Sequence, residues 1–542
     1  MKVFVLLVAA ITLLAALFIL QFTRFPSELP RLYIFDYLLR HEDLPGAAVV
    51  LAIALAAAVP ALGRPALALV EAIGRRPRET ALVTFLVLCV AQFLVAKTHA
   101  LAGDEHLILM QARAFAAGRL TAQFPPDLLT WVVPMPYQGL WLYASFDTGR
   151  VVSVYWPGFA LVLAPFALAG IAWACNPLLA AGVLFLTGRL AARFTGMPQA
   201  AGWAMLLLVA SPTFTGMALG YFSMMAHLFF NLLFVFLFLE RRLFLAGVVG
   251  SFALVLNNPV PHVLFAAPWI VWLAWREGRR SLFKLAAGYA PIALVVGLGW
   301  WLLMRDVQGH LRFEPYPGGT SGERFGNFVF YWQLQINRVF RDPSLTIVAK
   351  RTAELTKLWL WTVPGLLALA AAGAWLMRRE MYLRLLGLSF ACTWLGYFMV
   401  WFDQGYGWGA RYLHPALAAL PVLGAAAIIA LRSEELRRYA AAAALLSLVI
   451  ATPFRWLQIE SFMSDYLSRR PPVDPGVREI VFVKLDFPNY TQDFVQNDPF
   501  LREPAIFMLS RGRAADEELL REKFPRARLA HEAPYGHVWR LD

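Results

Sequence analysis

Two adjacent carboxylates, Asp104 and Glu105, follow directly on a long apolar run and are well suited to chemistry. Ionisable groups are costly to bury at a membrane boundary, so an acidic pair where a spanning helix meets water is a functional-site candidate. A carboxylate there can take a proton from a hydroxyl group as a general base. The structural alternative is a helix start, because Asp and Glu favour the first turn and residues 105–118 are expected to be helical.

Further polar side chains lie near the outer ends of the apolar runs, within a few residues of them. They are His99, His106, Arg150, Tyr155, His227, His262, Lys357, Asp403, Arg411, Tyr412 and His414. Because these residues all lie on the same side of the membrane, we predict a cavity that opens on the outer side. Arg residues there can hold a phosphate through paired hydrogen bonds, or they can simply anchor the membrane interface. His227 and His262 lie in or beside apolar runs, which favours core histidines over metal ligands.

The composition indicates a membrane protein with many spans. Of the 542 residues, 59% are hydrophobic and only 15% are charged, which is too apolar for a soluble globular chain. The formal net charge is +13, but the basic residues form short clusters between apolar runs, as cytoplasmic loops do. No basic face with interleaved aromatic residues is present, so no nucleic-acid partner is expected. The three cysteines lack metal-ligand spacing and a disulfide partner.

Loop charges predict the topology, because Lys and Arg concentrate on the cytoplasmic side. If the loops rich in Lys and Arg lie in the cytoplasm, the outer side of the membrane holds residues 99–157, 305–357, 403–410 and the C-terminal tail. This arrangement holds only if residues 158–174 begin and end on the same side. We therefore predict an all-α polytopic membrane protein with about 13 transmembrane helices, in which that run is a surface or re-entrant helix.

The chain divides into three expected domains. Residues 1–79 form two N-terminal transmembrane helices, residues 80–457 form the main transmembrane module, and residues 458–542 form a small α/β domain outside the membrane. In outer loop 99–157, a helix over 105–120 is expected to lie along the membrane surface with one apolar and one polar face.

The tail is expected to lean on the membrane part, since so short a domain buries only a modest core. Its expected elements are strands at 479–484, 505–509 and 537–541 and a helix at 516–524.

Soluble-enzyme motifs are absent from the sequence, including Gly-rich phosphate loops, nucleophile elbows and zinc spacings. Instead, Gly103-Asp104-Glu105 with Ala114 to Leu120, then Gly149 to Gly158, and then Gly405 to Leu413 resemble segments of the GT-C glycosyltransferases. That superfamily includes the protein O-mannosyltransferases and the lipid A aminoarabinose transferases. The resemblance covers about residues 80–430. In that family, a run like 158–174 lies along the membrane as a juxtamembrane helix.

The resemblance implies an inverting transferase that takes a sugar from a polyprenyl-phosphate donor and passes it to an acceptor hydroxyl on the outer face. It makes Asp104 the general base and Glu105 a neighbour that orients a helix or the acceptor. Arg411 becomes the first candidate for the donor phosphate, because Arg suits a phosphate leaving group.

The resemblance also implies roles for further residues. Arg150 and Lys357 are further candidates for the donor phosphate, and His106, Tyr155 and Tyr412 are candidates for the substrate cavity. The implied partners are a polyprenyl-phosphate sugar donor, an envelope glycan, lipid or protein acceptor, and the lipid bilayer of a bacterial inner membrane, with the site and the tail facing the periplasm. A divalent metal stays an open question, since members of the superfamily differ on it.

Three other functions remain open from the sequence, one of which is a non-catalytic sensor built on the same scaffold. An O-antigen ligase or polymerase would rely on Arg and His in a large outer loop, here Arg312 and His310, rather than on an acidic pair. A transporter or flippase would place polar residues near mid-membrane, often on broken helices with inverted repeats.

Overall fold

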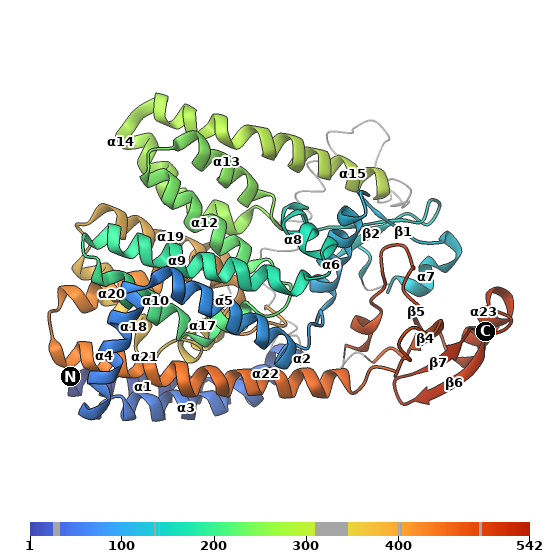
Figure 1. Cartoon of the computed structure of the whole chain (residues 1–542), viewed down its shortest axis with the longest axis horizontal. Coiled ribbons are helices and arrows are strands. Elements are labelled where there is room, and N and C mark those ends of the chain that lie inside the picture. Colours follow the sequence, from blue (N-terminus) through green and yellow to red (C-terminus); the bar gives the residue numbers. More distant parts are fainter. Residues whose placement is uncertain are drawn as a thin grey trace.

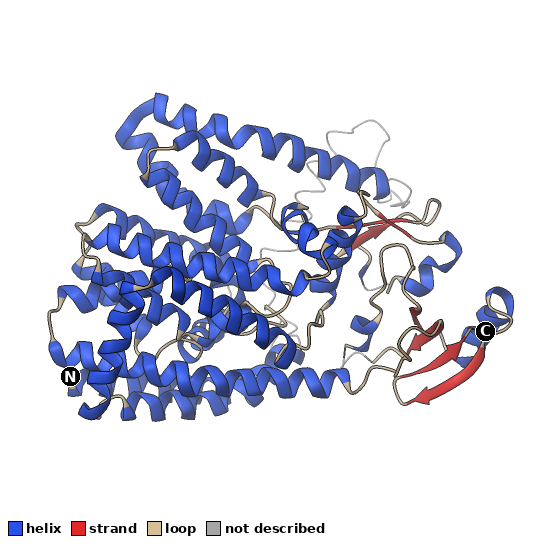
Figure 2. Cartoon of the chain, viewed as in Figure 1, coloured by secondary structure: helices blue, strands red, loops and turns tan. Residues whose placement is uncertain are grey.

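Helices dominate the computed structural model of the chain, and two small sheets lie together at one end of the long helical bundle (Figures 1 and 2). The structure describes residues 1–24, 33–134, 137–139, 141–308, 345–398, 400, 404–486 and 490–541. The predicted helical, multi-pass membrane architecture is confirmed in this coarse form.

Within those ranges, 5 helices are long and apolar enough to cross a membrane, or up to 6 if one bent pair forms a single span. The 5 are Lys2–Phe22 (α1), Pro77–Leu94 (α5), Ala172–Thr195, Val260–Gln308 and Glu434–Leu467. Shorter apolar helices of 10–17 residues accompany them. The count of about 13 spans therefore stays a prediction.

The expected single helix over residues 46–70 is wrong. The chain there forms α3 (Leu44–Ala56) and α4 (Pro60–Arg75), which meet at 98°. Pro60 explains the break, because proline lacks the amide that would continue α3 but suits the first position of α4. The run from residue 158 forms the short helix α8 (Gly158–Leu168), which has 11 residues. Its place at the membrane surface stays a prediction, because the helix Leu366–Leu376, predicted as a span, is equally short.

Most other helices of the bundle overlap the apolar runs that the sequence predicts as spans, but residues 200–219 and 358–377 each belong to two helices. Gly278, with φ +75°, interrupts α14, so the predicted runs 261–275 and 282–304 are indeed separate helices. The remaining bounds are α2 Tyr33–Leu38, α9 Cys175–Thr195, α10 Gln199–Val209, α11 Pro212–Met217, α12 Met224–Leu239, α13 Leu243–Leu254, α14 Val260–Ile292, α15 Gly299–Gln308, α17 Leu345–Leu360, α18 Leu366–Leu376, α19 Met381–Phe398, α20 Ala419–Ala430, α21 Glu434–Leu446 and α22 Thr452–Leu467.

The first outer loop folds into α6 (Gly103–Ala116), α7 (Leu129–Val132) and an antiparallel sheet in the order β1-β3-β2. Its strands are β1 (Ala122–Gln123), β2 (Leu142–Ala144) and β3 (Arg150–Ser153).

The expected polar face of α6 is only partly exposed. Arg113 is 40% exposed and pairs with Glu503 of the tail at 3.0 Å. Gln111 is 1% exposed, because its amide donates to the carbonyl of Leu120 at 2.8 Å and its oxygen accepts from the amide of Ser153 at 3.3 Å. The loop's own sheet thus covers Gln111.

The C-terminal tail contains a mixed sheet in the order β5-β4-β7-β6, in which β4 and β5 are parallel. Its elements are β4 (Glu479–Val483), β5 (Ala505–Leu509), α23 (Arg513–Lys523), β6 (Arg528–Ala533) and β7 (Gly536–Arg540). The predicted strands and helix are confirmed, and β6 was not predicted.

The first outer loop and the tail share one hydrophobic core, separate from the large core of the bundle. Leu107 and Leu129 from the loop pack there with Phe482 and Met508 from the tail. The ring of Trp131 meets that of Phe482 at 5.9 Å in an edge-on contact. The expectation that the tail leans on the membrane module is therefore confirmed, and its support is the loop that carries the acidic pair.

Candidate active site

Helix α6 positions both acids of the pair in its first turn, immediately after Gly103. Successive helical residues point about 100° apart, so Asp104 and Glu105 face different surroundings. The Ala102 N-cap supplies no side-chain hydrogen bond to this helix end.

Glu105 points into the protein, where it is 2% exposed. Its carboxylate accepts hydrogen bonds from the amides of Tyr221 at 2.5 Å and Leu101 at 2.9 Å. Burial raises the pKa of Glu105 to about 7, and the amide of Tyr221 opposes that shift. A Cβ atom at Gly220 would collide with the same carboxylate. Glu105 therefore ties the start of α6 to the chain just before α12.

Asp104 points instead to Arg411, which follows it by 307 residues. The Oδ2 atom of Asp104 lies 3.1 Å from Nη1 of Arg411, and each side chain is 14% exposed. The same Nη1 also donates to the carbonyl of Tyr406 at 3.2 Å. The resemblance-based grouping of Asp104 with Arg411 thus corresponds to a direct contact.

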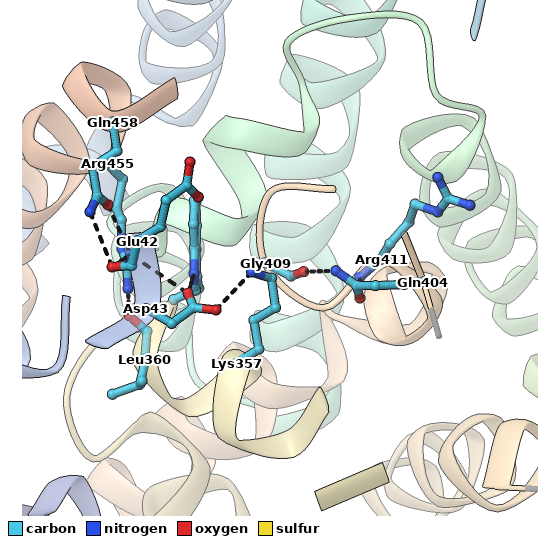
Figure 3. Close-up of polar contacts among 10 residues, drawn as sticks. Glu42, Asp43, Lys357, Leu360, Gln404, Gly409, Arg411, Arg455 and Gln458 are labelled. Atoms are coloured by element: carbon cyan, nitrogen blue, oxygen red, sulfur yellow. Dashed lines mark hydrogen bonds and ion pairs between the residues drawn. The ribbon is translucent and has the colours of Figure 1, made fainter. Parts of the chain in front are cut away.

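The loop before Arg411 is shaped by Gln404 and by its glycines. Gln404 donates to the carbonyl of Gly409 at 2.7 Å and accepts from the amide of Arg411 at 2.9 Å, as Figure 3 shows. Gly409 has φ +88°, and a Cβ atom there would collide with Thr213. The Gly-rich motif is therefore needed for close backbone packing, which places Arg411 at the start of a 3₁₀ turn, residues 411–416.

Aromatic rings surround the guanidinium of Arg411. Its Cζ lies 4.7 Å from the ring centre of Phe222 and 5.6 Å from that of Tyr412. Tyr412 stacks on Tyr397, with ring centres 5.0 Å apart. Burial and the charge of Asp104 raise the pKa of the Tyr155 hydroxyl, and the charge of Arg411 opposes this shift.

One donor of this guanidinium is unused. The Nε atom of Arg411 is buried and has no hydrogen-bond partner within the part of the chain that the structure describes. Buried donors without partners are rare because each costs desolvation energy. Arg411 can therefore present Nε and a terminal nitrogen side by side to an anionic ligand such as a phosphate.

Lys357 lies in a different place. Its Nζ is 2.8 Å from Oδ2 of Asp43, and both side chains are completely buried. Arg455 reaches the same carboxylate at 3.7 Å and donates to the carbonyl of Glu42 at 2.7 Å (Figure 3). The structure therefore pairs Lys357 with the N-terminal helices instead of with Asp104.

Arg150 and His106 also lie apart from the Asp104–Arg411 contact. Arg150, on β3, forms a part-exposed ion pair of 2.8 Å with Asp306 at the end of α15. His106 is 7% exposed, and burial, with the charge of Arg113, lowers its pKa to about 3. It is therefore neutral at physiological pH and fits the interior of α6.

Sequence reasoning missed Asp493 and Tyr137, which meet beside the start of α6: the Tyr137 hydroxyl donates to Asp493. His262 bridges Asn231 at 2.7 Å and Tyr289 at 2.6 Å, as a core histidine does.

No group of three or more His, Cys, Asp or Glu side chains in the described ranges is arranged to hold a metal. Asp403, Arg312, His310 and most of outer loop 305–357 lie outside the described residues.

Known proteins resemble this chain in fold more than in sequence. No family model matches it, and no curated protein matches its sequence. Crystal structures of ArnT from Cupriavidus metallidurans do match. The form bound to undecaprenyl phosphate aligns with a TM-score of 0.51 and 13% identity over 85% of this chain and 97% of that one. The apo form aligns over the same shares with a TM-score of 0.50 and 12% identity. This chain therefore shares the fold of ArnT.

Proposed function

We propose that this protein is an inverting glycosyltransferase of a bacterial inner membrane that uses a polyprenyl-phosphate sugar as donor. The acceptor is a hydroxyl group of an envelope glycan, lipid or protein, and the site and the C-terminal domain face the periplasm. The fold shared with ArnT supports this, since one of those crystal structures holds undecaprenyl phosphate. The observation that carries the proposal is the Asp104–Arg411 contact at 3.1 Å, with an unused buried donor on Arg411.

Each partner of this contact has a role in the proposed reaction. The acceptor oxygen attacks the anomeric carbon of the sugar, and the bond from that carbon to the phosphate oxygen breaks. The hydroxyl proton passes to the carboxylate of Asp104, and polyprenyl phosphate leaves with the electron pair of the broken bond. Arg411 stabilises the charge on that phosphate through Nε and a terminal nitrogen.

The ion pair is well placed to respond to the donor. Arg411 bonds to a single oxygen of Asp104, Oδ2. A donor phosphate would compete for the same guanidinium and loosen its hold on the carboxylate. The carboxylate of Asp104 would then be available to take the proton of the acceptor hydroxyl.

Replacing Asp104 with Asn tests this function, because Asn keeps the size of the side chain but cannot accept a proton. A deletion strain should lack one glycosyl residue in its envelope and accumulate a polyprenyl-phosphate sugar, both measured by mass spectrometry. Wild-type protein should restore the pattern. The Asp104→Asn variant should not, because loss of a general base slows transfer by about 10²–10⁴-fold.

Asp127 is a matched control in the same outer loop. Its side chain is 52% exposed and pairs with Lys523 at 2.8 Å, away from Arg411. The Asp127→Asn variant should restore the envelope as wild type does. Full restoration by Asp104→Asn at equal membrane abundance would refute the proposed base. If His310→Ala then failed to restore the pattern, the ligase or polymerase function would be favoured.

A further inference from the structure

A carboxylate from the C-terminal domain lies at the very start of α6. Asp493 sits in a short 3₁₀ turn, Thr491–Phe494, and is 3% exposed. The hydroxyl of Tyr137 donates to its Oδ1 atom, across 356 residues of sequence. The backbone amide of Gly103 also forms a hydrogen bond to this carboxylate. Asp493 thus joins the tail, the middle of the first outer loop and the first residue of α6.

Asp493 supplies a hydrogen-bond acceptor that the start of α6 lacks. The first amides of a helix have no partner inside it, and Ala102 offers no side-chain acceptor at the N-cap. Asp493 accepts from the amide of Gly103 in its place. Gly103 itself allows the fit, because a Cβ atom there would lie 2.9 Å from Cζ of Tyr137. The next residue along the helix is Asp104.

The same segment of the tail also touches the residues that hold Arg411. The ring of Tyr490 meets that of Tyr406 at 5.6 Å, and the carbonyl of Tyr406 is an acceptor for Arg411. Gln496 donates to the carbonyl of Ala100, just before α6, at 2.7 Å. The tail therefore contacts the structural supports of both partners in the Asp104–Arg411 pair.

The charge of Asp493 fits a supporting role. Burial raises the pKa of Asp493 to about 8, with the charges of Asp104 and Glu105 acting in the same direction. Hydrogen bonds from Tyr137 and Gly103 oppose this shift. Near neutral pH, Asp493 is therefore mostly protonated and adds little negative charge beside Asp104. Its contribution is the geometry of its hydrogen bonds.

We propose that Asp493 is a positioning residue of the transferase: by capping α6 from the C-terminal domain, it sets the place of Asp104 relative to Arg411. This inference rests on the proposed function for its effect on rate, although the cap itself can be measured without any activity. The C-terminal domain is then a working part of the site and more than a cover over it.

Variants of the full-length protein in detergent test the cap through hydrogen–deuterium exchange. Asp493→Ala removes both hydrogen bonds, whereas Asp493→Asn keeps an oxygen that can accept them. We expect faster exchange over residues 100–106 in Asp493→Ala and near wild-type exchange in Asp493→Asn. Tyr137→Phe removes only the hydroxyl contact and should give an intermediate result. Unchanged exchange in both Asp493→Ala and Tyr137→Phe would overturn the cap.

The kinetic test uses the sugar donor that accumulates in the deletion strain. Asp493→Ala should lower kcat by on the order of 10²-fold with KM for the donor changed little, because a small displacement of a catalytic group costs about that much. Asp493→Asn should recover most of the rate, which a role in charge or proton transfer would not allow.

Asp498 provides the control, since it accepts from the amides of Phe500 at 3.0 Å and Arg502 at 2.9 Å within the tail. Asp498→Ala should keep the wild-type kcat. If the wild-type protein had no transferase activity, the proposed function would be refuted, but the exchange result would still test the cap. If Asp493→Ala showed faster exchange and a normal kcat, only the positioning role would be refuted.

Discussion

Two acid–base contacts join distant parts of this bundle. They differ in how completely neighbouring groups satisfy the hydrogen bonds of the paired side chains. In the Asp43–Lys357 contact, both side chains are 0% exposed. Asp43 also accepts from Nε1 of Trp361, and Arg455 stacks over that ring at 4.3 Å. In the Asp104–Arg411 contact, each side chain is 14% exposed and Nε of Arg411 has no partner among the described residues.

This difference separates a structural ion pair from a candidate catalytic one. Burying charges is costly unless neighbouring groups satisfy them, and the first contact has Arg455 and Trp361 as such neighbours. The carboxylate of Glu42 beside it is buried and has no hydrogen-bond partner among the described residues. Its partners come from the N-terminal helices, α17 and α22, so it fastens residues 1–79 to the rest of the bundle. In the second contact, the buried Nε atom of Arg411 has no partner among the described residues, on a side chain that is 14% exposed. A ligand that reaches Nε can accept its hydrogen bond.

The largest expected effect comes from breaking the structural contact. Asp43→Ala would leave Lys357 and Arg455 buried without their shared counter-charge, which should destabilise the protein by about 3–5 kcal/mol. The thermal unfolding temperature in detergent and the yield of folded protein measure this. Asp104→Ala should change both only slightly, because its partner can reach solvent.

A double variant, Asp43→Leu with Lys357→Met, checks the cause of that loss. Replacing a buried ion pair by apolar residues of similar volume is often close to neutral, so the double variant should be more stable than Asp43→Ala. Equal instability in the two proteins would show that Asp43 acts through something other than its pairing with Lys357.

Arg411→Lys should produce the opposite pattern, with activity lost and stability kept. Lysine keeps the charge beside Asp104 but cannot offer two parallel donors to a phosphate. We expect transfer to fall about 10- to 100-fold, since charge-assisted hydrogen bonds contribute about 1.5–3 kcal/mol. Initial rates at varied donor concentration measure this. A lowered unfolding temperature with an unchanged rate would place Arg411 with Lys357 among structural residues.

The sequence predicted the residues of the candidate catalytic contact better than those of the structural one, for a physical reason. Asp104 and Arg411 each lie in a short motif at an outer span end, so both could be selected without knowing that they touch. Lys357 also lies at such an end, but its partner Asp43 precedes it by 314 residues in a segment without a motif. Nothing in the local pattern of Lys357 distinguishes a phosphate ligand from a buried counter-ion.

Short elements and distant contacts were the other limits of prediction. The strands of the first outer loop have 2 to 4 residues, too few to show an alternating pattern. Strand β6 is charged and mostly exposed, so it also lacks that pattern. Asp493 could not be found because only folding brings it to α6. Long apolar helices were predicted well, since composition alone defines them.

The stability of the protein should also depend on pH through Glu105 of the candidate site. Its pKa is raised by burial to about 7, so the folded state holds a proton that the unfolded chain releases near pH 4.5. Stability from this group is therefore complete below pH 4.5 and is lost as pH rises to 7. The wild type should lose about 1–3 kcal/mol over that interval, and Glu105→Gln should lose less. Thermal unfolding at several pH values measures this, and identical pH profiles would contradict the assignment.

The smallest expected effect comes from Arg150, which lies in neither contact. Its ion pair with Asp306 is part-exposed, with side-chain exposures of 29% and 61%. Such surface pairs contribute about 0–1 kcal/mol, because water and salt screen them. Arg150→Ala should therefore keep both the unfolding temperature and the transfer rate near wild type, measured in the same assays as Arg411→Lys. A rate loss as large as that of Arg411→Lys would mean that the donor phosphate reaches β3. The site would then extend beyond the Asp104–Arg411 contact to the sheet of the first outer loop.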